Sequence, residues 1–238
     1  RARLVGSEMC IRDRGNRVAL LAIDPSSPRT GGALLGDRVR ITSVDDETIK
    51  NDIYIRSIAT RKSSGSVPLI VADMIYFLHM AEWDRVIIET VGSGQSEVRC
   101  AAIADRIVVV EGPARGDGVQ AEKAGLLELA DAVIVNKSDL PGATKHAEEL
   151  LESFELGLGD TPPVMLTSAL NELGVEEAAG VLLELADSGR SVRARWRERL
   201  LAYNERKILE SPKLEEILGS LAVGSISIDE AINVLGGE

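Results

Sequence analysis

The sequence predicts an α/β fold, in which helices flank a mostly parallel sheet and a helical arm follows on the C-terminal side. Three observations predict it. Short apolar runs rich in β-branched residues are continuous rather than alternating, which is typical of strands buried on both faces of a parallel sheet. Helix-like stretches separate these runs, and strands that alternate with helices build parallel sheets. After Gly189 the apolar runs stop and charged, amphipathic stretches replace them.

Five apolar runs are expected to be strands. They are Val18 to Ile23, Val86 to Ile88, Ile107 to Val110, Ala132 to Val135 and Val164 to Thr167. Loops at the carboxyl ends of parallel strands are where α/β proteins bind ligands. The residues that directly follow each run are therefore the first candidates for a functional site.

The stretches between the runs have helical character. Pro68 to Met80 repeats apolar side chains at helical spacing, while Gln120 to Leu129 and Thr144 to Phe154 mix Ala, Leu, Glu and Lys. Near the start, Arg1 to Arg14 is followed by Gly15-Asn16, a pair that commonly ends a helix. We therefore expect the end of a helix there and helices in the other three stretches.

The sequence after Gly189 is predicted to form a separate helical appendage. Ser191 to Leu209 has the pattern of a long amphipathic helix rich in arginine. Ser211-Pro212 is expected to cap and open a second helix. Ser227 and Glu230 have the spacing of a capping box, which would open a third helix.

The composition is that of a globular chain and argues against several functions. The 238 residues include 27 Lys and Arg against 38 Asp and Glu, and a net charge of −11 argues against a general nucleic-acid binder. The apolar runs fall far short of the roughly 20 residues that span a bilayer. Two cysteines, Cys10 and Cys100, are too few for a disulfide framework, so we expect a reducing, cytoplasmic environment.

The most specific motif is Asn136-Lys137-Ser138-Asp139, which directly follows the run Ala132 to Val135. The Asp139 carboxylate can accept hydrogen bonds from both the ring N–H and the exocyclic amino group of guanine, a pair of donors that adenine does not present. The Asn136 amide can bridge neighbouring loops and the base, while the stem of Lys137 lies along the ring. An NKxD match is short, and an ordinary polar turn between strand and helix is the alternative interpretation.

The loop after the next run favours guanine binding. Ser168-Ala169-Leu170 follows Val164 to Thr167, and a loop of small residues there can offer backbone N–H groups to a guanine carbonyl. This tripeptide alone indicates little, but it stands in the right order after the NKxD motif. The predicted guanine site consists of Asn136, Lys137, Asp139, Ser168, Ala169 and Leu170.

Two further groups of residues indicate a phosphate held by magnesium. Glu89 could hold Mg²⁺ through water, Gly92 would let a backbone N–H approach a γ-phosphate, and Gln95 is placed to orient a water. Asp24 and Asp37 are joined by a glycine-containing stretch and could close over that phosphate. Without the guanine motif, Glu89 would be interpreted as a strand-end charge and Asp24 as a helix cap.

Taken in order, these motifs resemble the MeaB/ArgK-type GTPases, P-loop proteins associated with methylmalonyl-CoA mutase. The resemblance rests on the strings VALLAIDPSSPRTGGALLGDRVR, YIRSIATR, ETVGSGQSE, GDGVQAEKAGLLELAD and VNKSD, which fall in that family's order and spacing. It implies a P-loop fold whose C-terminal arm supports dimerisation. It also implies GTP hydrolysis and a chaperone role, in which the protein gates delivery of adenosylcobalamin to the mutase and protects that enzyme.

Carried onto this chain, the resemblance assigns roles to individual residues. The magnesium carboxylates would be Asp24, Asp37 and Glu89, and the catalytic group would be Glu89, Gly92 and Gln95. Gly116 to Lys123 matches a mobile segment that communicates with the mutase. The implied cofactors are GTP or GDP and Mg²⁺. The implied partners are an adenosylcobalamin-dependent acyl-CoA mutase and a second copy of the chain.

The chain departs from the family in ways that bear on activity. Gly116-Asp117-Gly118-Val119-Gln120 stands where the family usually has GDELQ, and no G-x-x-x-x-G-K followed by Ser or Thr occurs. We therefore expect the chain to lack the first strand and the phosphate loop, to bind GTP weakly and to hydrolyse it poorly. The expected parts are a non-native leader at 1–14, a partial GTPase domain at 15–189 and a dimerisation arm at 190–238.

Two other classes of protein stay open. A nickel-insertion GTPase would need Cys and His ligands, and the four residues available are scattered in the sequence: Cys10, His79, Cys100 and His146. A non-catalytic binding module would use the sheet as a scaffold for the arm. Arginines in the arm could indicate nucleic acid, but their alternation with Trp196 and Leu200 suits a solvated face over a dimer seam. We expect neither nucleic acid nor membrane among the partners.

Overall fold

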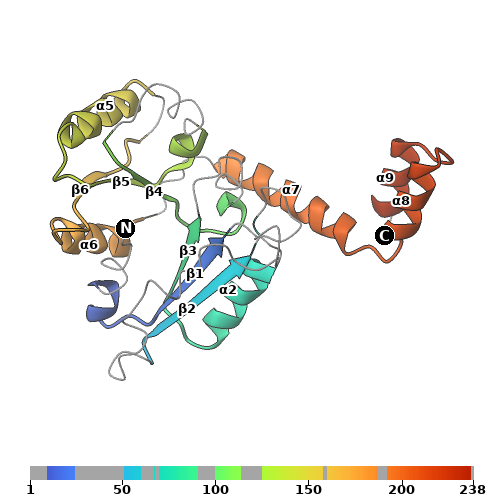
Figure 1. The fold of residues 1–238 in the computed structure, drawn as a ribbon, viewed down its shortest axis with the longest axis horizontal. Coiled ribbons are helices and arrows are strands. Elements are labelled where there is room, and N and C mark those ends of the chain that lie inside the picture. Colours follow the sequence, from blue (N-terminus) through green and yellow to red (C-terminus); the bar gives the residue numbers. More distant parts are fainter. Residues whose placement is uncertain are drawn as a thin grey trace.

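The structure is a computed structural model. Its described residues form two parallel sheets of three strands each, which make up the body of the molecule (Figure 1). The first sheet has the order β2 (Ile53–Ala59), β1 (Val18–Asp24), β3 (Arg85–Thr90), and the second has β4 (Val108–Glu111), β5 (Ala132–Asn136), β6 (Val164–Thr167). Every pairing is parallel, which confirms the predicted class. The structure describes residues 10–24, 51–59, 67, 70–90, 100–113, 125–157, 160–186 and 192–236.

All five predicted runs form strands, each with ends within two residues of the expected ones. The sequence did not predict β2. Its apolar residues are interrupted by Arg56 and Ser57, so it lacks the continuous pattern of the other strands. This pattern suits its place at one side of the sheet, where it pairs with β1 alone among the described strands.

The continuous apolar sequence of β1 follows from burial on both faces. On one face, Leu21 packs against Val71 of α2 (Ile70–Met80). On the other face, Val18 packs against Ile11 and against Ala179 of α6 (Val175–Glu184). Helix α2 confirms the described part of the predicted helix from Pro68 to Met80, whereas α6 was not predicted.

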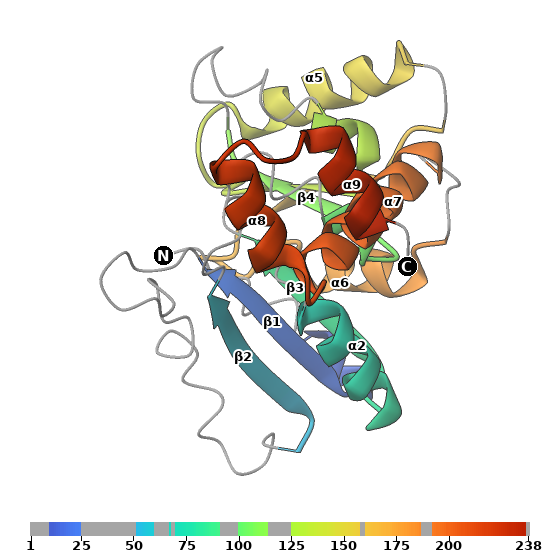
Figure 2. The same cartoon turned by 90° about the vertical axis from the view of Figure 1, so that its right-hand side faces the viewer.

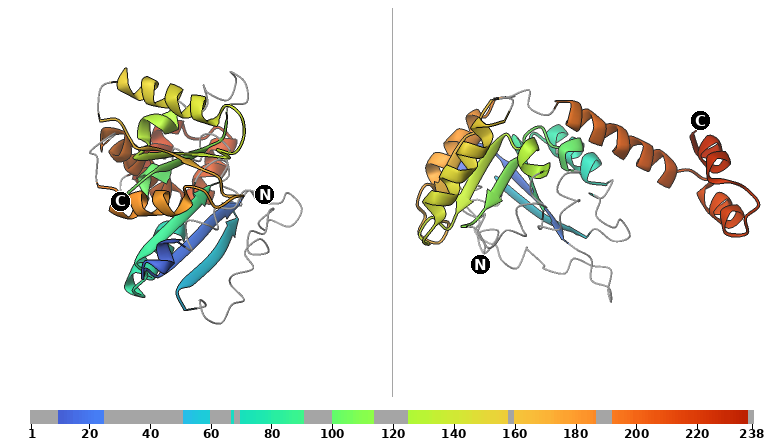
Figure 3. Two further views of the ribbon diagram at one scale, coloured as in Figure 1. Left: turned by 90° about the vertical axis from the view of Figure 1, so that its left-hand side faces the viewer. Right: turned by 90° about the horizontal axis from the view of Figure 1, so that it is seen from above.

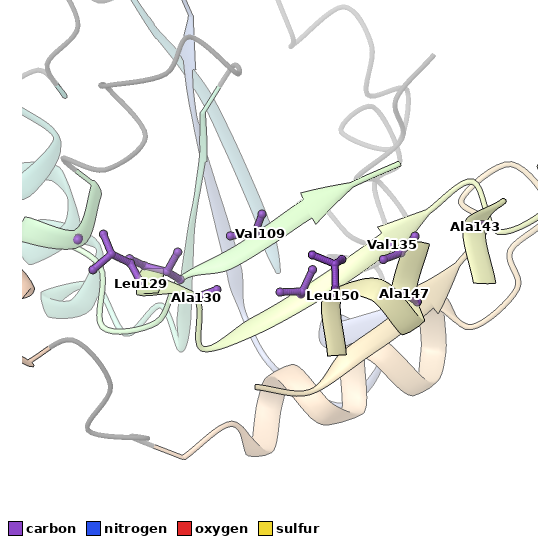
Figure 4. Close-up of a cluster of buried hydrophobic side chains, with 10 residues drawn as sticks. Val109, Leu129, Ala130, Val135, Ala143, Ala147 and Leu150 are labelled. Carbon is purple, nitrogen blue, oxygen red and sulfur yellow. The ribbon is translucent and has the colours of Figure 1, made fainter. Parts of the chain in front are cut away.

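The core of the second sheet lies between its strands and α5 (Ala143–Glu155), as Figure 4 shows. Val133 and Val135 of β5 are completely buried, and Ala147 and Leu150 of α5 pack onto the same face. Helix α5 confirms the helix predicted from Thr144 to Phe154. Residues 125–129 are also helical, which agrees with the described part of the helix expected from Gln120 to Leu129.

Near the start of the chain, the predicted end of a helix is present. Residues 10–13 are helical, and the Gly15 N–H donates to the Arg12 carbonyl at 2.7 Å. Gly15 has a φ of +83°, the left-handed conformation that glycine adopts without strain.

The arm leads away from the body through α7 (Val192–Leu209) to the helices α8 (Leu214–Ala222) and α9 (Ile228–Gly236), as the right-hand view of Figure 3 shows. Figure 2, seen from the side of the arm, shows α8 and α9 next to each other. They share a small core of Ile217, Ala231 and Leu235. We call α8 and α9 the tip of the arm.

The two predicted caps of the tip have different outcomes. The capping box is confirmed, since the Glu230 N–H donates to the Ser227 hydroxyl at 3.2 Å and the Ser227 N–H donates to the Glu230 carboxylate at 2.8 Å. The expected cap at Ser211-Pro212 is confirmed only in part. The Ser211 hydroxyl accepts the Lys213 N–H at 3.3 Å within a turn, and α8 begins only at Leu214. Within the described part of the chain, no helix is both long and apolar enough to cross a bilayer.

Candidate functional site

The loops after β5 and β6 begin side by side because the two strands pair in parallel. Their register places Asn136 opposite Thr167, so the predicted guanine residues of both loops follow directly from paired positions. Beyond the strands, the Ser138 N–H still donates to the Thr167 carbonyl at 2.9 Å. The sheet therefore brings together two segments that lie about thirty residues apart in the chain.

The side-chain oxygen of Asn136 joins the two loops. This Oδ1 atom accepts the Lys137 N–H at 2.8 Å, the Ala169 N–H at 3.1 Å and the Thr167 hydroxyl at 3.4 Å. With Oδ1 occupied by donors from both loops, the Asn136 amide is held in one orientation. Its bridging position is the one that the NKxD motif led us to expect.

Ser168 orients the carboxylate of Asp139. The serine is fully buried, and its hydroxyl donates to Asp139 Oδ1 at 2.5 Å, a distance typical of a short hydrogen bond to a carboxylate. Asp139 itself is exposed. One oxygen of the carboxylate is therefore fixed by the protein, and the group as a whole remains accessible to a ligand.

The sequence assigned only a backbone role to Ser168. Its hydroxyl contact depends on how far the loop after β6 turns, which residue types alone do not reveal. The backbone of Ser168 exchanges hydrogen bonds with Leu173, which closes a tight turn and leaves Leu170 81% exposed at its corner. Leu170 is thus available to a ligand but makes no part of the fixed geometry.

Lys137 has a left-handed backbone, with a φ of +63°. This conformation costs a residue other than glycine about 1 kcal/mol or more, and such strain gathers at functional sites. The Lys137 Cδ atom lies 4.0 Å from the point where a Cβ on Gly112 would stand, so its stem passes over the glycine that follows β4. Gly112 is a neighbour of the site that the sequence did not reveal.

A buried pair fixes the end of β4. His146 Nε2 of α5 and Glu111 Oε2 of β4 lie 2.8 Å apart, and the two side chains are only 7% and 10% exposed. His146, one of the scattered candidates for a nickel ligand, is therefore engaged with Glu111. Its Nδ1 atom is buried and has no hydrogen-bond partner.

The predicted magnesium residues are only partly described. The register of the first sheet pairs Ala22 with Glu89 and Ile23 with Thr90, so the backbone of Asp24 stands just beyond, at the carboxyl end of the neighbouring strand. Asp37, Gly92, Gln95 and the segment from Gly116 to Lys123 lie outside the described residues. Among the residues that are described, no group of three or more His, Cys, Asp or Glu could hold a metal ion.

A family model described as "Methylmalonyl Co-A mutase-associated GTPase MeaB" matches residues 4–210. A putative GTPase of Pyrococcus abyssi is 42% identical over 172 residues, which are 70% of this chain and 52% of that protein. The GTPase ArgK of Escherichia coli is 33% identical over 193 residues, 76% of this chain and 57% of that protein. A mitochondrial methylmalonic aciduria type A homolog of Caenorhabditis elegans is 32% identical over 193 residues, 77% of this chain and 47% of that protein. The chain spans about half the length of the curated relatives it matches.

Two solved structures have a similar fold. HypB from Helicobacter pylori in complex with nickel has a TM-score of 0.53 at 19% identity, covering 76% of this chain and 79% of that one. The hydrogenase maturation factor HypB from Archaeoglobus fulgidus has a TM-score of 0.52 at 19% identity, covering 76% and 82%. At this identity the similarity concerns the fold alone.

Proposed function

The chain belongs to the methylmalonyl Co-A mutase-associated GTPase MeaB family, and on this premise we propose that it recognises guanine nucleotides through the loops after β5 and β6. The observation that carries the proposal is the Asp139 carboxylate, held by the buried hydroxyl of Ser168 at 2.5 Å. A carboxylate fixed in this way can accept both the ring N–H and the amino group of guanine. Adenine offers no such pair of donors, so the same contact excludes it.

Two neighbours complete the base site in this proposal. Asn136 keeps the loops after β5 and β6 together through the Ala169 N–H, which donates to its Oδ1 atom rather than pointing free toward a base carbonyl. The stem of Lys137 forms an apolar surface against which the ring can stack. The left-handed backbone of Lys137 is compatible with this role, although Glu82 and Glu172 adopt the same conformation in other turns.

For the whole protein we propose GTP hydrolysis with Mg²⁺ held by Asp24, Asp37 and Glu89, and with Gly92 and Gln95 at the γ-phosphate. Asp24 and Glu89 fit such a site, because β1 and β3 are neighbours and present both residues at the same end of the sheet. Magnesium would neutralise charge that develops on the phosphates. A chaperone role toward an adenosylcobalamin-dependent acyl-CoA mutase, a dimeric state and a cytoplasmic location belong to the same proposal.

This chain by itself is proposed to bind the base but to hold phosphates weakly. Its sequence contains no G-x-x-x-x-G-K motif, whose backbone N–H groups and Lys cradle the phosphates. The strand order supports the proposal. Among the described strands, β3 pairs with β1 alone and β4 with β5 alone, so each is an edge strand to which a further strand could add.

The test of base recognition is a change of specificity at Asp139. In Asp139→Asn, the side-chain amide can no longer accept both guanine donors, so affinity for GDP should fall about 100-fold. The new amide N–H can instead donate to the second carbonyl of xanthine, and binding of xanthosine diphosphate should increase. Ligand-observed NMR suits the weak binding expected, with GDP, ADP and xanthosine diphosphate compared on each variant.

Asp105→Asn is the matched control, because Asp105 is an exposed carboxylate that lies shortly before β4 and outside the loops after β5 and β6. It should bind GDP like the parent chain. Equal binding of GDP and ADP by the parent chain would sink the proposal. So would identical behaviour of the Asp139 and Asp105 variants. Hydrolysis needs a separate test on a variant of this chain to which a phosphate loop has been added. If that variant turns over no nucleotide, the alternative of a non-catalytic binding module is favoured.

A further inference from the structure

The base of the arm is attached to the body through a buried arginine. Arg195 of α7 is 9% exposed, and its Nη1 atom donates to the Ala104 carbonyl at 2.9 Å. Its Nη2 atom donates to the carboxylate of Asp131, which is only 3% exposed. One turn further along α7, Arg199 Nε donates to the Ala102 carbonyl at 3.2 Å. These contacts fix the first turns of α7.

The same carboxylate also holds the second sheet. Asp131 Oδ2 accepts the Ile107 N–H at 2.8 Å, one residue before β4 begins, and Asp131 itself directly precedes β5. The Asp131 N–H in turn donates to the Ile107 carbonyl at 2.8 Å. One buried carboxylate therefore ties the arm to the starts of two neighbouring strands. A buried ion pair is costly to form and contributes little net stability, so its use here favours a role in fixing geometry.

Strand β5 connects this attachment to the guanine site. It runs from Ala132 to Asn136, a rise of about 17 Å from Asp131 to Asn136. Ala132, Val133 and Val135 are completely buried, and β5 is paired on both sides by β4 and β6. A strand packed so densely on all sides shifts as a unit rather than bending locally. A displacement at Asp131 would therefore reach the Asn136 amide.

We propose that the Arg195–Asp131 pair couples the position of the arm to the guanine-binding loops, with Arg195 as a positioning residue. The proposal rests on the proposed function, since it assigns a regulator to that same site. Coupling of this kind is reciprocal. A guanine nucleotide that orders the loops after β5 and β6 also holds α7 in place, and a partner that moves the arm changes nucleotide affinity.

The test removes the pair without leaving a lone buried charge. In the double variant Arg195→Met with Asp131→Asn, the asparagine oxygen can still accept the Ile107 N–H, so the strands keep their contact. Helix α7 loses the Arg195 contacts and keeps that of Arg199. Arg197→Met is the control, because Arg197 lies on the same helix but is exposed. Hydrogen exchange of the full chain, measured by mass spectrometry without nucleotide, reports the outcome peptide by peptide.

The double variant should exchange faster in two places, at 192–199 and at the loops 136–139 and 168–170, while α9 and the control variant stay unchanged. Its affinity for GDP, measured by ligand-observed NMR, should fall about fivefold or more. Faster exchange in α7 with unchanged loops would overturn the coupling. If the parent chain fails to bind GDP, the proposed function falls, yet the exchange data still decide whether arm and loops are coupled.

A conservative variant guards against loss of folding. Arg195→Lys keeps a positive charge for Asp131 but cannot also reach the Ala104 carbonyl with a second donor. Loop exchange in this variant should lie between that of the parent and that of the double variant. Loop exchange equal to the parent's, with α7 loosened, would also overturn the proposal.

Discussion

At the level of single residues, the candidate site depends on hydrogen bonds that hold polar side chains in one orientation. Asn136 and Asp139 were predicted from residue type and spacing, because the NKxD motif lies in one continuous segment. The hydroxyl of Ser168 and the position of Gly112 were not predicted. Both contacts join segments from different strands, so they depend on the register of the second sheet, which short motifs do not encode.

Ser168→Ala tests whether orientation of Asp139 matters. The hydroxyl is lost, but Asp139 is exposed and can be solvated instead, so we expect stability to fall by only about 1 kcal/mol. Guanine binding should fall several-fold, because the carboxylate then samples other rotamers. Urea unfolding and ligand-observed NMR with GDP measure the two effects. Ser153→Ala, an exposed serine of α5, is the control. Unchanged GDP affinity in Ser168→Ala would contradict the assigned role.

At the level of elements, the continuity of the apolar sequence decided which strands could be predicted. β1 and β5 are buried on both faces and have continuous apolar sequences. β2 carries Arg56 and Ser57 and was missed. α6 was missed too, because its buried residues Ala178 and Ala179 are small and no side-chain cap marks its start. Helices α2, α5 and α7 have longer repeating patterns and were predicted.

Two glycines that precede helices allow a matched test of backbone geometry. Gly142 before α5 and Gly174 before α6 both have positive φ, +89° and +68°. A Cβ at Gly174 would lie 2.3 Å from the Leu166 carbonyl oxygen, whereas a Cβ at Gly142 would meet nothing within 4 Å. Gly142→Ala should therefore cost about 1 kcal/mol of stability, and Gly174→Ala about 3 kcal/mol or more.

Urea unfolding of both variants, monitored by circular dichroism, measures this difference. Because both residues occupy the same position relative to a helix, the left-handed backbone contributes equally and the contact with Leu166 makes the difference. Similar stability losses in the two variants would mean that the loop after β6 relaxes around the added methyl group.

The capping box of α9 predicts a dependence on pH. Hydrogen bonds from the backbone N–H and the hydroxyl of Ser227 lower the pKa of Glu230 below its ordinary value of 4.5. A lowered folded-state pKa means that the ionised carboxylate stabilises the cap. That stabilisation is present above pH 4.5 and is lost as the pH falls through the folded-state pKa.

Glu230→Gln should therefore fray the first turn of α9 at neutral pH, and acid should change this variant less than the parent. NMR chemical shifts of residues 228–236 report the helix content at each pH. Glu216→Gln, an exposed glutamate in the first turn of α8, is the control. Equal acid responses of parent and Glu230→Gln would show that the charge of Glu230 contributes nothing to the cap.

At the level of the whole molecule, α7 connects the two sheets. Its base binds Asp131 beside the second sheet, while Arg206 near its end lies 3.4 Å from Asp73 of α2, which covers the first sheet. Helix α6 makes a second connection, since it follows β6 and packs Ala179 against Val18 of β1. The sequence predicted five of the six described strands and the arm, but not these connections, because they join residues far apart in the chain.

The arm presents an exposed apolar stripe along α7, in which the Arg199 guanidinium lies 5.2 Å from the centroid of the Trp196 ring. Val192, Trp196, Leu200 and Tyr203 recur along α7 at intervals of three and four residues, and all are exposed. Trp196, Leu200 and Tyr203 have the four-then-three spacing of a coiled-coil seam, and Val192 extends the stripe beside it. Exposed apolar surface of this kind marks interfaces between proteins. The stripe supports the proposed dimer, in which the stripes of two copies would bury each other.

Leu200→Glu should weaken that dimer, because the charge would be buried at the centre of the seam. Leu201→Glu is a matched control: the adjacent leucine is 48% exposed against 61% for Leu200, and it lies about 100° around the helix, away from the stripe. Sedimentation velocity over a range of concentrations should show a dissociation constant raised about tenfold or more for Leu200→Glu and little change for Leu201→Glu. If the stripe forms the dimer interface, Leu200 is buried in it and Leu201 is not, so the two substitutions must differ in effect. A monomeric parent chain, or equal effects of the two substitutions, would therefore show that the stripe is not the interface.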